Sequence, residues 1–195
     1  MSIVDGMPRS QAELRKLLEL TAPVIQKVID ALDLPPEAKA VLEQVQKGHP
    51  LADIYGLTQQ ERDAMFVRGC QLLQAGEVEK ARDWFIFLHQ LDPLDERLIY
   101  AIATIFQTQG DFRRAAKLYV HFIAFDATNP EGHLRLAECF LSAREYDLAI
   151  EHFRIAKTMC DRGYGNAAAA ELAIKMLAHA NERRAAHGLA RQAHH

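Results

Sequence analysis

The sequence predicts an all-α fold: a solenoid of three helix-pair repeats, with an N-terminal helical arm before it and a C-terminal capping helix after it. Three observations support this prediction. One pattern of small and large apolar residues occurs three times, at an interval of 34 residues, between Met65 and Met159. Alanine and leucine are abundant and runs of β-branched residues are absent, which favours helices over strands. Glycines stand where the first helix of a pair must end and the chain must reverse.

Six columns keep their register in the three copies. The copies consist of Gly69, Leu72, Gly76, Ala81, Phe85 and Leu88, then Ala103, Phe106, Gly110, Ala115, Tyr119 and Phe122, and then Ala137, Phe140, Arg144, Ala149, Phe153 and Ala156. Arg144 is the one break in the turn column. This period and alternation are typical of the tetratricopeptide repeat (TPR), in which each repeat is a pair of antiparallel helices. The repeats are predicted at about 62–95, 96–129 and 130–163.

Residues 1–57 are predicted to form the helical arm. Its apolar stripe consists of Leu14, Leu17, Leu18, Val24, Val28 and Leu32. So short an arm cannot bury this stripe within itself, so we expect either a cap folded onto the first repeat or an arm that forms a homodimer when no client is bound. A short helix at 37–46 and the run GHPLADIYGL at 48–57 complete the arm.

Residues 58–160 are predicted to contain the repeat helices. Thr58 and Glu61 have the spacing of a capping box, which opens the first repeat. Helices are expected at about 59–74, 78–91, 95–108, 112–125, 130–142 and 146–159, with Pro93 and Pro130 beginning new helices. Residues 164–195 are the predicted capping helix and tail, in which Asn166 caps a helix that runs to about His187.

Composition and motifs exclude several classes of function. The net charge of −3 gives no strong attraction to nucleic acid or anionic membranes, and no apolar run is long enough to span a bilayer. Three cysteines without metal-type spacing fit a reducing cytosol. The sequence has no phosphate-binding loop, nucleophile elbow or paired histidine motif, so we expect no enzyme, no cofactor and no metal site.

The first helices of the repeats are expected to line a concave groove. The residues on their inner face are Phe66, Cys70 and Leu73, then Tyr100, Thr104 and Gln107, and then Leu134, Glu138 and Leu141, with Asp63, Arg97 and Glu131 at the edge. The alternative is that they pack within the repeats. An apolar groove with a few polar groups suits an extended peptide with hydrophobic anchors. Phe66 and Cys70 cannot donate strongly to a carboxylate, which disfavours a clamp for a C-terminal carboxylate.

Several runs together resemble the class II chaperones of bacterial type III secretion. They are GHPLADIYGL, LDP after the first helix pair, LAECFL in the third repeat, and the closing helix; the resemblance covers about residues 48–160. It implies a small cytoplasmic protein that holds two hydrophobic translocator proteins before export. It also implies that a Pro-x-Leu-x-x-Pro-like client segment lies in the groove against Phe66, Cys70, Leu73, Tyr100, Thr104, Leu134 and Glu138. Cys70 and Leu73 depart from the aromatic residues frequent in that family.

Two other functions remain open from the sequence. Some members of the resembled family also bind an AraC-like transcription activator of the secretion genes, so a role as transcriptional co-regulator is one alternative. A TPR scaffold for pilus or envelope assembly, unrelated to secretion, is the other.

Overall fold

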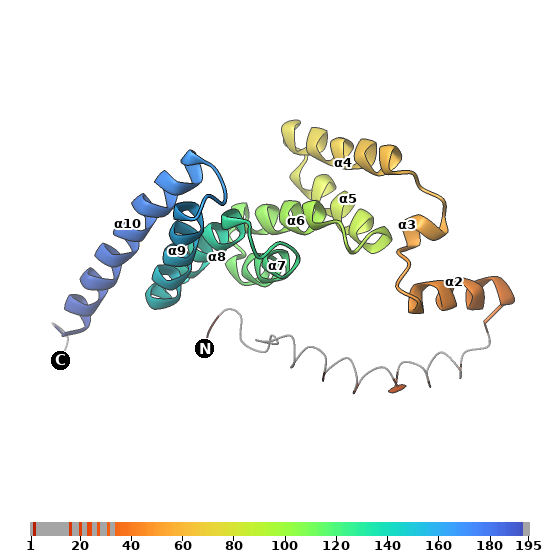
Figure 1. The fold of residues 1–195 in the computed structure, drawn as a ribbon, viewed down its shortest axis with the longest axis horizontal. Helices are drawn as coiled ribbons and strands as arrows, with labels where there is room; N and C mark the ends of the chain where they lie inside the picture. The colour runs from red at the N-terminus through yellow and green to blue at the C-terminus, as the bar shows by residue number, and fades with distance from the viewer. Residues whose placement is uncertain are drawn as a thin grey trace.

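The computed structural model describes residues 34–192 and, before them, the isolated residues Ser2, Lys16, Leu20, Pro23, Val24, Lys27 and Ala31. Within this described part every regular element is a helix, and most helices follow one another in antiparallel pairs (Figure 1). The predicted all-α fold is therefore confirmed. No helix in the described residues has both the length and the apolar character that crossing a bilayer requires.

Three helix pairs form the repeats. They are α4 (Gln59–Gln74) with α5 (Val78–Leu91), α6 (Glu96–Thr108) with α7 (Phe112–Phe125), and α8 (Pro130–Ser142) with α9 (Tyr146–Asp161). Contacts of α5 with α6 and of α7 with α8 stack each pair on the next. The long helix α10 (Ala167–Gln192) packs along α9 and touches α8, as expected of a cap on the last repeat (Figure 1).

Side chains cap the helices at the two ends of the repeat region. The backbone N–H of Glu61 donates to Thr58 Oγ1 at 3.3 Å, and the Glu61 carboxylate accepts the Thr58 N–H at 2.8 Å, so the predicted capping box is present. The Thr58 hydroxyl also donates to the Glu61 carboxylate at 2.7 Å, and this hydrogen bond, together with that from the Thr58 N–H, lowers the pKa of Glu61. Asn166 accepts the N–H of Ala169 at 2.8 Å at the start of α10, also as predicted.

The prediction that Pro93 begins a helix is wrong. The chain passes through a turn after Asp92, and α6 begins at Glu96 with Asp95 as its N-cap. The Asp95 carboxylate accepts the N–H of Arg97 at 3.0 Å, so the side-chain cap rather than the proline ring determines where the helix starts.

The repeated columns form the core. Their alanines and aromatic residues are fully buried, namely Ala81, Ala103, Ala115, Ala137, Ala149, Phe85, Tyr119 and Phe153. Among the glycines of the described residues, the tightest packing is at Gly69 in α4, where an added Cβ atom would lie 2.4 Å from the ring of Phe85. A glycine is therefore required for α4 and α5 to pack at this distance.

Arg144 ends the first helix of the third repeat in a conformation that favours glycine. Gly76 and Gly110 have φ angles of 76° and 79°, and Arg144 in the same column has a φ of 63°. A residue with a Cβ atom is strained in this left-handed region by about 1 kcal/mol.

We expect the Arg144→Gly variant to be more stable by about 0.5–1 kcal/mol, because it relieves this backbone strain. Urea unfolding followed by circular dichroism measures the change. Arg144→Ala is the matched control: it also removes the exposed arginine side chain but keeps the Cβ atom, so it should give no gain. Equal stabilisation by both variants would assign the effect to the side chain instead.

Two short elements precede the repeats. Helix α3 (Leu51–Ile54) contacts α5 and buries Ala52, whereas α2 (Pro36–Gln46) contacts α3 and buries none of its residues. Arg62 of α4 pairs with Asp53 of α3 and, at 3.0 Å, with Asp92, and so joins α3 to the first repeat. Of the residues predicted to form a dimer, Leu14, Leu17, Leu18, Val28 and Leu32 lie outside the described part, and Val24 is exposed.

Candidate peptide-binding surface

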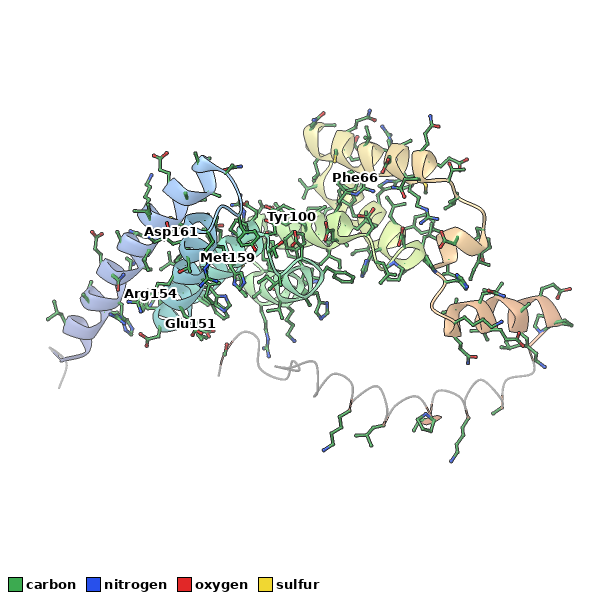
Figure 2. The ribbon with its side chains drawn as sticks, in the orientation of Figure 1. Phe66, Tyr100, Glu151, Arg154, Met159 and Asp161 are labelled. Atoms are coloured by element: carbon green, nitrogen blue, oxygen red, sulfur yellow. The ribbon has the colours of Figure 1, made fainter. Side chains whose placement is uncertain are left out.

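The predicted groove residues lie on the first helices of the three pairs. We call them the stripe: Asp63, Phe66, Cys70 and Leu73 on α4, Arg97, Tyr100, Thr104 and Gln107 on α6, and Leu134, Glu138 and Leu141 on α8. All except Leu134 are partly exposed. Figure 2 shows Phe66 on α4 and Tyr100 near the middle of the row of helices.

The α4 end of the stripe is apolar with one cation against it. The ring of Phe66 lies 5.5 Å from that of Phe85, and the Arg97 guanidinium carbon lies 5.0 Å from the Phe66 ring centre. Cys70 and Leu73 are half-buried and pack against the core. Arg97 therefore covers one part of an otherwise apolar surface, in a cation–π contact.

Arg97 also holds the edge of the stripe together. It donates to Asp63 of α4 at 2.8 Å and to both oxygens of Asp95 at 2.7–3.2 Å. The hydrogen bond from Arg97 is the main reason that the pKa of Asp63 is lowered. This arginine thus connects the first helices of two adjacent repeats.

The middle of the stripe is polar and centres on Arg135 of α8. Its Nε donates to Tyr100 Oη at 3.2 Å and to Glu131 at 2.9 Å, and its Nη1 donates to Glu138 at 3.1 Å. Tyr100 in turn donates to Glu131 at 3.0 Å. Burial raises the pKa of Tyr100, so its phenol remains protonated and can donate.

This cluster continues through Gln107 into the core. Gln107 donates to Glu138 at 2.8 Å and accepts from the Tyr119 hydroxyl at 2.7 Å, while Thr104 Oγ1 lies 3.1 Å from the same hydroxyl. Burial raises the pKa of Tyr119 as well. We call these residues and Tyr100, Glu131 and Arg135 the polar network. It links α6, α7 and α8, where the sequence predicts a mainly apolar groove.

Arg135 and Tyr119 were not among the predicted site residues. A signal for Arg135 was present, because Glu131, Arg135 and Glu138 are spaced at i, i+4 and i+7 and therefore share one helix face. The repeat pattern places Tyr119 in the packing column, and its ring is indeed fully buried, but its hydroxyl donates to Gln107 of the stripe. A repeat pattern indicates that a large ring stands at a position, but it does not indicate which group the phenol oxygen contacts.

The assignment of Leu134 to the accessible stripe is wrong. Leu134 occupies the position equivalent to Phe66 and Tyr100, but it has no exposed surface. A leucine extends less far from its helix than these aromatic side chains do, and α10 packs against α8 at this end of the solenoid. Leu134 therefore belongs to the core and cannot contact a peptide.

Open clefts lie both beside the stripe and away from it. One of about 640 Å³ adjoins the stripe at Arg97 and Asp95 and extends to His49 and Asp53. Another, of about 570 Å³, lies on α9 and includes Glu151, which Figure 2 shows far from Phe66. Within the described residues, no group of three or more His, Cys, Asp or Glu side chains is placed to hold a metal ion.

Comparisons with known proteins agree with this architecture. The tetratricopeptide repeat family matches residues 100–164. A comparison with curated protein sequences finds no match. Solved structures do match. One is PcrH, a protein of Pseudomonas aeruginosa, in complex with the chaperone binding region of PopD. The two sequences are 26% identical, the TM-score is 0.62, and the match covers 66% of this chain and 97% of that chain.

Two further structures extend the comparison. The type III secretion translocator chaperone SycD of Yersinia enterocolitica has 19% identity and a TM-score of 0.60, and the match covers 69% of this chain and 98% of SycD. A chain of a type III secretion complex from Aeromonas hydrophila has 23% identity and a TM-score of 0.66, with 75% and 97% covered. These two matches show a shared fold, and the match to PcrH, at 26% identity, supports the resemblance to this group of chaperones that the sequence predicts.

Proposed function

We propose that this chain is a type III secretion chaperone that binds hydrophobic translocator proteins through an extended Pro/Leu-containing segment along the stripe. The chain keeps these clients soluble and apart from each other until export. Exposed membrane-seeking segments aggregate or insert prematurely, and a bound chaperone prevents this by covering the anchor segment. The process needs no nucleotide and no catalytic residue, since the export machinery can drive release.

One observation carries the proposal: Phe66 and Tyr100 occupy equivalent positions on adjacent first helices, and both remain partly exposed. Exposed aromatic rings on a folded scaffold are typical anchors of protein interfaces. The similar fold of PcrH, which is solved in complex with the chaperone binding region of PopD, and that of SycD, which is solved with a peptide of the translocator YopD, support a client of this kind for this chain.

Co-purification tests the proposal in the bacterium that encodes the chain. The tagged protein should retain the translocators of that bacterium's secretion system, identified by mass spectrometry. Recovery of pilus or envelope assembly proteins, with no translocator, would support a general TPR scaffold and contradict the proposal.

The Phe66→Glu variant is expected to bind a labelled Pro-x-Leu-x-x-Pro peptide at least about tenfold more weakly, which is about 1.4 kcal/mol. The substitution places a charge where an apolar client side chain docks, and that charge loses water on binding. Fluorescence anisotropy measures the affinity, and a thermal melt checks the fold.

Phe87→Glu is the matched control for this prediction. Phe87 lies on α5 of the same repeat and is 47% exposed, so the same substitution adds a charge outside the stripe. It should leave peptide affinity within about twofold of the original. Normal binding by Phe66→Glu, or equal losses in both variants, would mean that the stripe is not the binding face. Tyr100→Glu is a poorer test, because it also removes the hydrogen bond from Tyr100 to Glu131 in the polar network.

A further inference from the structure

We infer that the bound segment carries a lysine or arginine two positions from the apolar residue that docks on Tyr100. This inference rests on the proposed function and specifies the chemistry of its client. It follows from the distribution of charge along the stripe and from the position of Tyr100 between an apolar and an acidic region.

Carboxylates outnumber cations in the ion pairs that the stripe forms with the adjacent residues Asp95, Glu131 and Arg135. Asp63 and Asp95 share the single guanidinium of Arg97, and Glu131 and Glu138 share that of Arg135. Each pair of carboxylates thus retains one uncompensated negative charge.

The carboxylate pair of Glu131 and Glu138 is accessible to a client and carries more negative charge than Arg135 neutralises. The side chains of Glu131 and Glu138 are 31% and 18% exposed, so an incoming group can reach them, although they are partly shielded from water. An ionised carboxylate can accept about four hydrogen bonds, and Glu138 receives those of Arg135 and Gln107. An ammonium or guanidinium group of a client can therefore add to this site without displacing Arg135.

Tyr100 connects this acidic site to the apolar surface. Its ring is part of an aromatic group with Tyr119 and Phe122, at centre distances of 5.8 and 5.2 Å, while its hydroxyl lies 3.0 Å from Glu131. Successive side chains of an extended chain point to opposite faces, so the residue two positions from an apolar residue docked on the ring, about 6.6 Å away, lies on the same face and beside the carboxylates. A basic residue at that position is attracted there and an acidic residue is repelled.

A peptide series tests the inference on the unmodified protein. The probes are labelled Pro-x-Leu-x-x-Pro peptides with lysine, glutamine or glutamate at each of the three variable positions in turn and serine at the others. At one position or more, the lysine peptide should bind at least about tenfold more tightly than the glutamate peptide at about 0.05 M salt, and the ratio should shrink at about 0.5 M salt because ions screen exposed charges.

Variants of the protein then show which carboxylates cause the preference for lysine over glutamate. Glu138→Gln and Glu131→Gln should each reduce the preference for lysine over glutamate severalfold. Glu151→Gln, the same change at an exposed site on α9, should preserve the preference. Equal binding of the lysine, glutamine and glutamate peptides, or tighter binding of glutamate, overturns the inference and leaves the proposed function standing. If no peptide of the series binds, while the Phe66→Glu protein and the original behave alike, both are overturned.

Discussion

The Ala115→Glu variant is expected to unfold the solenoid, with a loss of about 4 kcal/mol or more in the free energy of unfolding. Ala115 has no exposed surface and lies in the column of small residues through which the helices of a pair approach each other. A glutamate there must either push the helices apart or bury a carboxylate without hydrogen-bond partners. Small domains have only about 5–15 kcal/mol of stability, so the loss removes much of the total.

Thermal melts followed by circular dichroism in the far ultraviolet, where helices give a strong negative signal, measure this change, and urea unfolding gives its free energy. Ala124→Glu is the matched control, because Ala124 lies in the same helix, α7, but is exposed. The control should melt close to the original protein. A cooperative melt of Ala115→Glu near that of the control would show that the column does not form the inter-helix contact described.

The helices could be predicted from the sequence because of the same steric constraint, which is the small space between the two helices of a pair. A close contact between helices tolerates only glycine or alanine, as at Gly69, Ala103 and Ala137, and a solenoid repeats this contact in every pair. The repeat therefore reports the positions of helices directly. The spacing of Thr58 and Glu61 also predicts a capping box, which is present in the structure.

The errors arose where long side chains act between repeats. Arg135 reaches Tyr100 of the preceding repeat, and the direction of so flexible a side chain depends on the neighbours that receive it. Leu134 shares a column with Phe66 and Tyr100, but the lengths of these side chains determine which of them reach solvent. Periodicity thus placed the backbone of the stripe, whereas the polar network required atomic contacts.

The polar network also changes how a client is expected to bind. An apolar groove discriminates poorly between hydrophobic segments, because most such segments bury similar area. If a client binds along the stripe as we propose, the fixed carboxylates and guanidinium groups between α6 and α8 would add a penalty for partners with the wrong charge. The apolar end would then contribute affinity and the polar middle selectivity.

Acidification is expected to destabilise the third repeat through a pair of histidines. His133 of α8 and His152 of α9 place their Nδ1 atoms 2.9 Å apart, with ring centres separated by 5.2 Å, and the ring of Phe140 lies 5.5 Å from His152. One Nδ1 must be bare to accept the hydrogen bond, so the pair cannot carry protons on both atoms. Burial and the proximity of His152 lower the pKa of His133 to about 4, and burial lowers that of His152.

The direction of the pH effect follows from these lowered pKa values. Above about pH 7 the histidines are neutral in the folded and the unfolded chain, and stability does not depend on them. Between about pH 6.5 and 4 the unfolded chain binds protons that the folded chain does not, so the free energy of unfolding falls as the pH falls. His133 alone should contribute a loss of about 2 kcal/mol between about pH 7 and 5, and about 3 kcal/mol by about pH 4.

The His133→Asn variant separates this contribution from that of the carboxylates, most of which titrate below about pH 5. Asparagine can place an amide near the former Nδ1 position and bond His152, but it does not titrate, so the variant should lose about 2 kcal/mol less than the original protein between about pH 7 and 5. His179→Asn, at an exposed position on α10, should retain the original pH dependence. Parallel urea titrations of the three proteins decide the matter: if His133→Asn loses stability with pH as steeply as His179→Asn, the pair is not held in its neutral form and another group causes the acid sensitivity.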